Sequence, residues 1–312
     1  MTYSYKIKEE ISKIESSKVE KISELSGMIR TNSDIKMYSI RVQTENKNVA
    51  NRIFNIVKEI YDVTCNVTVR KNYNFKKNEI YIVEIKRDVI KIIKDLGFIK
   101  GDSIQMLPVP SEEIVADDEL KKAFLRGCFL ISGSVNDPKT SRYHLEIITD
   151  TDVYAKFICA VLNYFKLNAR TYRRKKGYMV YIKESEKISD FLKLISAYDG
   201  VLYYEDIRAL REKLNRDNRI NNCEQANVEK TINTAVSQIK DINYIKAIDA
   251  YDLLDDKLKV VAEYREKYPE SSLLELSNII SIETGNKMTK SCLNHRLRKI
   301  KELAIKLKEK NN

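Results

Sequence analysis

The side chains best suited to recognising another molecule gather near the C-terminus. Residues 287–310 contain nine Lys or Arg and only two Glu. Leu293, Leu297 and Ile300 recur at spacings of four and three, which predicts one helix with an apolar stripe. Basic and amide side chains off that stripe can bind the phosphates and base edges of double-stranded DNA. The candidate contact residues are Thr289, Lys290, Ser291, Asn294, His295, Arg296, Arg298, Lys299 and Lys301.

These candidates divide by their chemistry. Asn294 and Arg298 lie one helical turn apart, so both side chains can enter the major groove together. An asparagine can read adenine bidentately, and an arginine can read guanine or clamp a phosphate. Lys299, Lys301 and the more distant Lys306 are better suited to phosphate.

A second helix signal precedes this basic helix. Ser272 and Glu275 have the spacing of a capping box, and Pro269 ends the helix before it. Thr289 is placed as the N-cap of the basic helix. Two helices in this order predict a helix-turn-helix over residues 272–306, with Lys306 as its last residue, whose second helix recognises DNA.

Two points about this motif stay open in the sequence. The stretch SIETGNKM between the two helices is longer than the usual turn, so either the first helix runs on or the turn is expanded. An ordinary solvated basic helix at residues 290–308 is the alternative interpretation of the charge.

Few other residues could do chemistry. The chain has two histidines and five widely spaced cysteines without a CxxC pair, which argues against a disulfide framework and a zinc ribbon. Neither GxxxxGK[ST] nor GxGxxG occurs, so no phosphate cradle is evident. We therefore expect no metal ion and no cofactor.

The composition favours packed domains and an anionic partner. The chain has 312 residues, of which 43% are hydrophobic, and two or three domains are expected. The net charge of +11 points to nucleic acid, although a lysine-rich proteome would produce the same value. The sequence shows no secretion signal and no apolar run long enough to span a membrane, so we expect a cytoplasmic, nucleoid-associated protein without membrane contact.

The first two thirds of the chain contain an internal repeat. ELSGMIRTNSDI at residues 24–35 matches FLRGCFLISGSV at residues 124–135, and the strand-like YSIRVQTE and YHLEIITD follow. Both copies continue with a helix-spaced stretch, two strands and an amphipathic helix. The order α-β-β-α-β-β-α is thus predicted over residues 19–98 and 119–199. This predicts an α+β domain with pseudo-two-fold symmetry in residues 1–204.

After residue 204 the strand signals disappear and helix formers dominate. Residues 205–222 are highly charged and predict either a connecting helix or an extended linker. Residues 223–312 predict an all-α domain that contains the helix-turn-helix. Its helices are expected at residues 228–248, 256–268, 272–282 and 290–308.

The two Leu-x-Gly helices resemble the LAGLIDADG motif of homing endonucleases. In that fold the two motif helices cross in close contact, which small residues permit. The resemblance implies that Gly27 and Gly127 form this contact.

The same resemblance implies an acidic residue at the end of each helix, where it would hold a catalytic divalent metal ion. Those positions are Asn32 and Ser132, and neither supplies the carboxylate that Mg²⁺ prefers. The nearest downstream acids, Asp34 and Asp137, are expected on the following turn or strand. The chain is therefore expected to retain the packing residues of the motif and to lack its catalytic residues.

The stretches FLRGCFLISGSVNDP, NCEQAN and NHRLRKI together resemble the WhiA family over essentially the whole chain. This resemblance implies a degenerate LAGLIDADG domain joined to a helix-turn-helix similar to region 4 of sigma factors. It implies DNA binding without catalysis, in transcription regulation, cell division and chromosome segregation, and in sporulation where the organism sporulates. RNA polymerase, a sigma factor or other regulators are the candidate protein partners.

The sequence thus predicts a non-enzymatic bacterial DNA-binding protein. Two alternatives remain open at this stage. An active LAGLIDADG endonuclease or maturase is disfavoured by Asn32 and Ser132. A nucleoid-associated protein with little sequence preference fits the same residues as a site-specific regulator.

Overall fold

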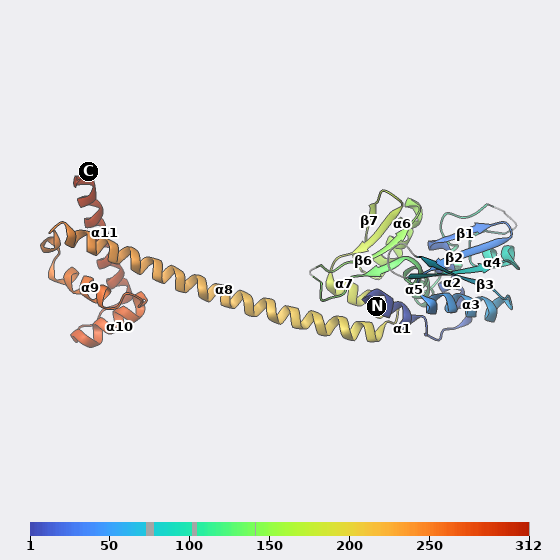
Figure 1. Cartoon of the computed structure of the whole chain (residues 1–312), viewed down its shortest axis with the longest axis horizontal. Coiled ribbons are helices and arrows are strands. Elements are labelled where there is room, and N and C mark those ends of the chain that lie inside the picture. The colour runs from blue at the N-terminus through green and yellow to red at the C-terminus, as the bar shows by residue number, and fades with distance from the viewer. Residues whose placement is uncertain (73–77, 102–104, 141, 312) are drawn as a thin grey trace. The chain divides into compact units, whose positions relative to one another are not determined.

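A computed structural model of the chain describes residues 1–72, 78–101, 105–140 and 142–311 (Figure 1). Met1–Arg211 and Glu212–Asn312 form separate compact units. The boundary between them falls inside the helix α8 (Tyr198–Ala247).

The N-terminal unit contains two copies of one helix and strand order, which confirms the predicted α+β repeat. The first copy consists of α2 (Lys18–Thr31), β1 (Ser33–Lys36), β2 (Ser39–Thr44), α3 (Lys47–Tyr61), β3 (Asn66–Asn72), β4 (Asn78–Ile85) and α4 (Val89–Asp95). The second consists of α5 (Asp118–Ser132), β5 (Gly133–Val135), β6 (Leu145–Thr149), α6 (Asp152–Tyr164), β7 (Arg170–Arg173), β8 (Tyr178–Ile182) and α7 (Ser185–Leu194). Helix α1 (Tyr3–Ile11) precedes the first copy, and a short 3-10 helix, η1 (Glu112–Val115), lies between the copies.

The strands of each copy form an antiparallel sheet of the same topology. Among the described residues the strand orders are β1-β2-β4-β3 and β5-β6-β8-β7. The register is equivalent as well, since Val42 pairs with Val83 and Ile147 pairs with Val180. All four side chains are buried in one core that both copies share.

Helices α2 and α5 lie side by side, and their backbones touch at two glycines (Figure 1). A Cβ added to Gly27 would lie 2.3 Å from the carbonyl oxygen of Phe124. A Cβ added to Gly127 would lie 2.0 Å from the carbonyl oxygen of Glu24. A helix that carried a side chain at either position would have to move away from its neighbour, so glycine allows this close approach.

One buried carboxylate joins the two repeats beside this contact. The Glu24 side chain is fully buried, and its Oε1 accepts a hydrogen bond from Arg52 Nε of α3 at 2.9 Å. Its Oε2 accepts from Arg126 Nε of α5 at 2.8 Å. Both arginines are buried too, so two guanidinium groups share the single carboxylate in the core, and one positive charge is left over.

The C-terminal unit is built from helices. Helix α8 is followed by η2 (Tyr251–Leu253), α9 (Asp256–Lys267), α10 (Leu273–Thr284) and α11 (Lys290–Asn311). The structure corrects the predicted start of the first of these helices, because α8 begins at residue 198 and includes residues 205–222. The physical reason is visible in the sequence, since neither glycine nor proline occurs between Gly200 and Pro269 to interrupt the helix.

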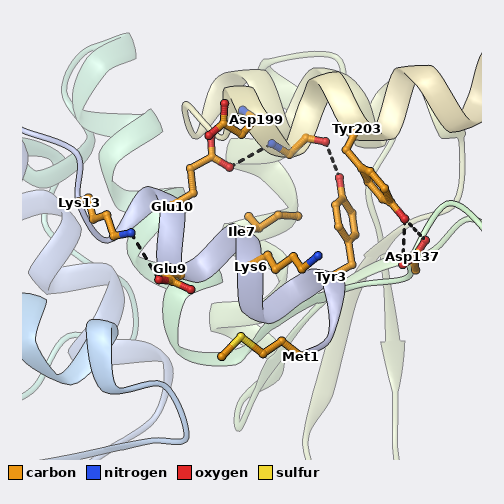
Figure 2. Close-up of a pocket in the computed structure, with 11 residues that line it drawn as sticks. Met1, Tyr3, Lys6, Ile7, Glu9, Glu10, Lys13, Asp137, Asp199 and Tyr203 are labelled. Atoms are coloured by element: carbon orange, nitrogen blue, oxygen red, sulfur yellow. Dashed lines mark hydrogen bonds and ion pairs between the residues drawn. The ribbon is translucent and has the colours of Figure 1, made fainter.

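Helix α1 holds the first turn of α8 (Figure 2). The Glu10 carboxylate accepts hydrogen bonds from the backbone N–H groups of Asp199 at 2.8 Å and Gly200 at 3.0 Å. The Tyr3 hydroxyl donates to the carbonyl oxygen of Gly200 at 2.7 Å. Glu10 therefore caps the N-terminus of α8 from another element, where donors have no partner within the helix.

The core of the C-terminal unit is formed by apolar residues from α8, α9, α10 and α11. Its buried members include Ile242 and Ile245 of α8, Val261 of α9 and Leu276 and Ile280 of α10. Helix α11 contributes its predicted apolar stripe, in which Leu293, Leu297, Ile300 and Ala304 are buried.

The contact between α2 and α5 predicts that a single methyl group added there lowers the stability of the N-terminal unit. Gly127→Ala should lower the free energy of unfolding of the N-terminal unit by about 1–3 kcal/mol, because the new Cβ overlaps backbone atoms that cannot rotate away. Thermal denaturation measures the change. Gly200→Ala is a matched control, since its Cβ would meet the Ile7 side chain at 3.1 Å. Equal melting temperatures of the two variants would contradict the close contact.

The buried carboxylate predicts a second effect. Glu24→Gln should destabilise the unit by about 3–5 kcal/mol, because it leaves two buried guanidinium groups without a counter-charge. The exposed pair of Lys156 with Asp152 provides the control, and Asp152→Asn should cost less than about 1 kcal/mol. Chemical denaturation of both variants tests the difference. Similar losses would mean that burial does not strengthen the Glu24 interactions.

Candidate nucleic-acid interface

The first helix of the predicted helix-turn-helix is α10. Ser272 Oγ accepts from the Glu275 backbone N–H at 3.3 Å, and Glu275 Oε2 accepts from the Ser272 N–H at 2.8 Å, so the capping box is formed. The helix continues to Thr284 and ends at Gly285, whose φ of 69° is in the left-handed region that glycine favours. The long SIETGNKM stretch is therefore the last turn of α10 followed by a short connection.

That connection is tied to the end of α10 by a serine inside the helix. Ser281 Oγ donates to the Ser277 carbonyl at 2.7 Å and accepts from the Met288 backbone N–H at 2.8 Å. Thr289 then caps α11, because its Oγ1 accepts from the Cys292 N–H at 3.2 Å. These bonds orient the start of α11 relative to α10.

The connection between α9 and α10 is held from inside. The buried Arg265 donates through Nη1 to the Ser271 carbonyl at 2.7 Å. Lys267 pairs with Glu283 of α10 at 3.0 Å, and this hydrogen bond raises the pKa of the lysine. Hydrogen bonds from the Tyr268 hydroxyl and then from Lys267 lower the pKa of Glu283. The charge of Lys267 is thus already compensated within the protein.

Helix α11 presents a different kind of surface. Opposite its buried stripe, Lys290, Asn294, His295, Arg298 and Lys299 are exposed. Ser291 and Lys301 are exposed as well, and Arg296 is half-buried. Within the described part of the chain, the side chains of these eight residues make no hydrogen bond or ion pair with the protein. An exposed face of unpaired amide, guanidinium and ammonium groups can bind anions and base edges.

The structure corrects the predicted end of the second helix. The helix was expected to end at residue 308, but α11 runs to Asn311. The physical reason is that no glycine or proline follows Gly285, and that Leu303 and Leu307 extend the apolar stripe against the core. Lys306 is therefore an exposed residue inside the helix.

Two of the predicted base-reading residues share one side of α11. Asn294, Arg298 and Lys301 line a groove of about 680 Å³ whose other wall is the part of α8 that belongs to the same unit. Ser291 and His295 do not line this groove. The sequence alone could not place α8 there, because the two segments are about sixty residues apart.

The positions that would carry the motif acids differ in their surroundings, since Asn32 is exposed and Ser132 makes a structural contact. Asn32 follows the last residue of α2, and Ser132 ends α5 and donates through Oγ to the Ile148 carbonyl at 2.7 Å. Asp34 lies in β1 and pairs with Lys36 at 3.5 Å. Asp137 accepts a hydrogen bond from the Tyr203 hydroxyl at 3.2 Å.

A lysine from α1 lies beside these helix ends. Lys8 Nζ donates to the Ile131 carbonyl in the last turn of α5 at 3.4 Å. Lys8 shares a groove of about 420 Å³ with Asn32, Ser134 and Glu45. Burial lowers the pKa of Lys8 to about 8, and the nearby Glu45 opposes the shift. A cation at this place repels a divalent metal ion and would compete with it for the one carboxylate of the groove.

Within the ranges that the structure covers, no group of three or more His, Cys, Asp and Glu side chains could hold a metal ion. Among the same residues, no helix is both long and apolar enough to cross a bilayer.

The sequence did not identify several residues whose hydrogen bonds hold each of the two units together internally. Lys8, Arg265 and Ser281 find their partners only in the tertiary structure. Glu24 and Arg126 could have been noticed in the sequence. Glu24 lies one turn before Gly27 and Arg126 lies next to Gly127, so each places a charge on an otherwise buried helix face.

Comparisons with known proteins agree over the whole chain. Residues 18–99 match the WhiA N-terminal LAGLIDADG-like domain, residues 121–213 match the WhiA LAGLIDADG-like domain, and residues 218–304 match the WhiA C-terminal HTH domain. The probable cell division protein WhiA of Bacillus mycoides strain KBAB4 is 41% identical over 99% of this chain and 98% of its own. The protein of the same name from Enterococcus faecalis strain V583 is 41% identical over 100% of both chains.

Solved structures show the same architecture. Full-length DUF199/WhiA from Thermatoga maritima has 26% sequence identity and a TM-score of 0.61, over 98% of this chain and 99% of that one. A structure of the N-terminal LAGLIDADG domain of DUF199/WhiA has 27% identity and a TM-score of 0.52, over 62% of this chain and 90% of that one. With both LAGLIDADG-like halves and the helix-turn-helix matched, the chain belongs to the WhiA family and has the domains of a DNA-binding regulator.

Proposed function

We propose that this protein binds duplex DNA through α11 and regulates transcription from the bound sites. The observation that carries the proposal is the exposed face of α11, where basic and amide side chains have no partner among the described residues. The capping of α10 and α11 supports it, because these bonds orient α11 as a recognition helix.

The contacts on DNA are proposed to divide by position. Asn294 and Arg298 contact base edges, where amide and guanidinium groups distinguish one base pair from another. Affinity that does not depend on sequence comes from phosphate contacts of Lys290, Lys299, Lys301 and Lys306. The proposed contact surface is completed by Thr289, Ser291, His295 and Arg296.

The LAGLIDADG-like unit is proposed to act as a scaffold without nuclease activity. The positions of the motif acids are Asn32 and Ser132, and the ammonium group of Lys8 occupies the groove beside them. Asp34 and Asp137 are each engaged in another contact. Hydrolysis of DNA by this unit would need metal ligands that its helix ends do not supply.

The cellular role is proposed from the relatives. Their name, probable cell division protein, supports a regulator that controls cell division from the nucleoid. Chromosome segregation and, in a sporulating organism, sporulation are proposed as processes under the same control. RNA polymerase, a sigma factor or other regulators are the proposed protein partners.

The test is binding to a duplex selected from a random pool and to random duplexes, over a salt series. Asn294→Ala and Arg298→Ala should each cost roughly 1–3 kcal/mol on the selected duplex and little on random DNA. Lys299→Ala should weaken both alike and reduce the salt slope by about one. Lys257→Ala, an exposed lysine of α9, is the control and should bind like the unchanged protein.

Two results would contradict this assignment. If Asn294→Ala and Arg298→Ala weaken both duplexes equally, α11 does not read bases and a nucleoid-coating protein is the better description. If none of the α11 variants differs from Lys257→Ala, α11 does not bind DNA.

The absence of nuclease activity has its own test. Purified protein incubated with supercoiled plasmid and Mg²⁺ or Mn²⁺ should leave the plasmid uncut, since two motif carboxylates are missing. Nicking that persists through purification and disappears in Asp34→Asn or Asp137→Asn would show that an alternative metal site operates.

A further inference from the structure

One face of α8 is polar at every position but one, although it lies beside another helix. The residues of α8 that line the groove toward α11 recur every three or four positions and therefore share a face. They are Ala226, Glu229, Lys230, Asn233, Thr234, Ser237, Gln238 and Asp241. A face that packed against α11 would be apolar. This face is instead suited to hold a polar occupant between the two helices.

The charges that line the groove favour an anion. Lys230, Arg298 and Lys301 make no ion pair within the described residues. Of the two acids, Asp241 pairs with Lys308 at 3.0 Å, and Glu229 Oε1 accepts from Gln225 Nε2 at 3.0 Å. The free cations therefore outnumber the free carboxylates.

Resting on the proposed function, we propose that the Lys230, Asn233 and Ser237 face of α8 binds the sugar-phosphate backbone of the DNA that α11 reads. The groove then holds one DNA strand between a wall that reads bases and a wall that positions the backbone. The DNA interface is thereby formed by two helices and extends into a part of the chain that precedes the helix-turn-helix.

The donor chemistry fits phosphate oxygens. Lys, Asn and Ser side chains are among the common donors to the DNA backbone. The hydroxyl of Thr234 is already used, since it donates to the Lys230 carbonyl at 2.7 Å. From Lys230 to Ser237 the helix rises roughly 10 Å, which corresponds to about three phosphates of one strand.

The position of the groove favours DNA over an acidic protein segment. Asn294 and Arg298 form one wall, and both are proposed to contact base edges. A duplex bound by these residues lies at the opening of the groove. Its backbone can therefore contact the polar face of α8 in the same complex, whereas a protein segment would have to bind separately.

The experiment uses the full-length chain and the two duplexes of the previous test. Lys230→Gln should weaken binding to both duplexes by about threefold to tenfold and reduce the salt slope by about one, because one phosphate contact is lost. Asn233→Ala should weaken both by about threefold without changing the slope, since a neutral donor releases no counterion. Lys240→Gln is the matched control, because Lys240 is exposed on α8 and does not line the groove.

One result would contradict backbone binding by α8. In that result, Lys230→Gln and Asn233→Ala bind both duplexes with the same affinity as Lys240→Gln, while Arg298→Ala no longer binds the selected duplex. That result leaves DNA binding by α11 intact and makes an acidic protein segment the better occupant. If Arg298→Ala and Lys299→Ala are also without effect, the proposed function itself fails. Thermal melting of each variant controls for folding, and exposed side chains on this face should leave it unchanged.

Discussion

The contact between the backbones of α2 and α5 is the constraint on which the N-terminal unit depends. Because the two helices touch at Gly27 and Gly127, each repeat is held against the other along its first helix. Each sheet begins directly after one of these helices, so the position of the contact also sets where the two sheets begin. Glu24 uses the same proximity, since its carboxylate reaches arginines of both repeats within a core that excludes water.

The helix crossing and the metal site of the LAGLIDADG motif depend on different residues. Packing at the helix crossing requires glycine and apolar residues, whereas metal binding requires one carboxylate at each helix end. These demands fall on different residues, so Asn32 and Ser132 can replace the acids without loosening the crossing. Ser132 Oγ now bonds to β6, and Lys8 adds a cation beside the helix ends. The helix crossing is thereby kept, while the two helix ends carry no carboxylate at these positions.

Much of the fold could be predicted because the signals were local. The repeat followed from the Leu-x-Gly helices and the alternating strands, and the start of α10 followed from Ser272 and Glu275. The end of α10 stayed open in the sequence. The length of α8 was harder, because residues 205–222 are rich in charge and asparagine, which weaken a helix prediction. The exposed side chains of α11 could be named from the apolar stripe. The polar face of α8 beside α11 could not be predicted, because α8 and α11 are far apart in the sequence and are brought together only by the tertiary structure.

The anchoring of α8 by α1 has a consequence for how the chain folds as it is made. Helix α1 contacts α3 of the first repeat, but it also bonds to Val135 and Gly200, which are synthesised much later. The contacts of Tyr3 and Ile7 with Gly200 can therefore form only after both repeats have emerged. Contacts of such long sequence separation form late and slow folding. The residues of α1 are thus translated well before the partners that join them to α8.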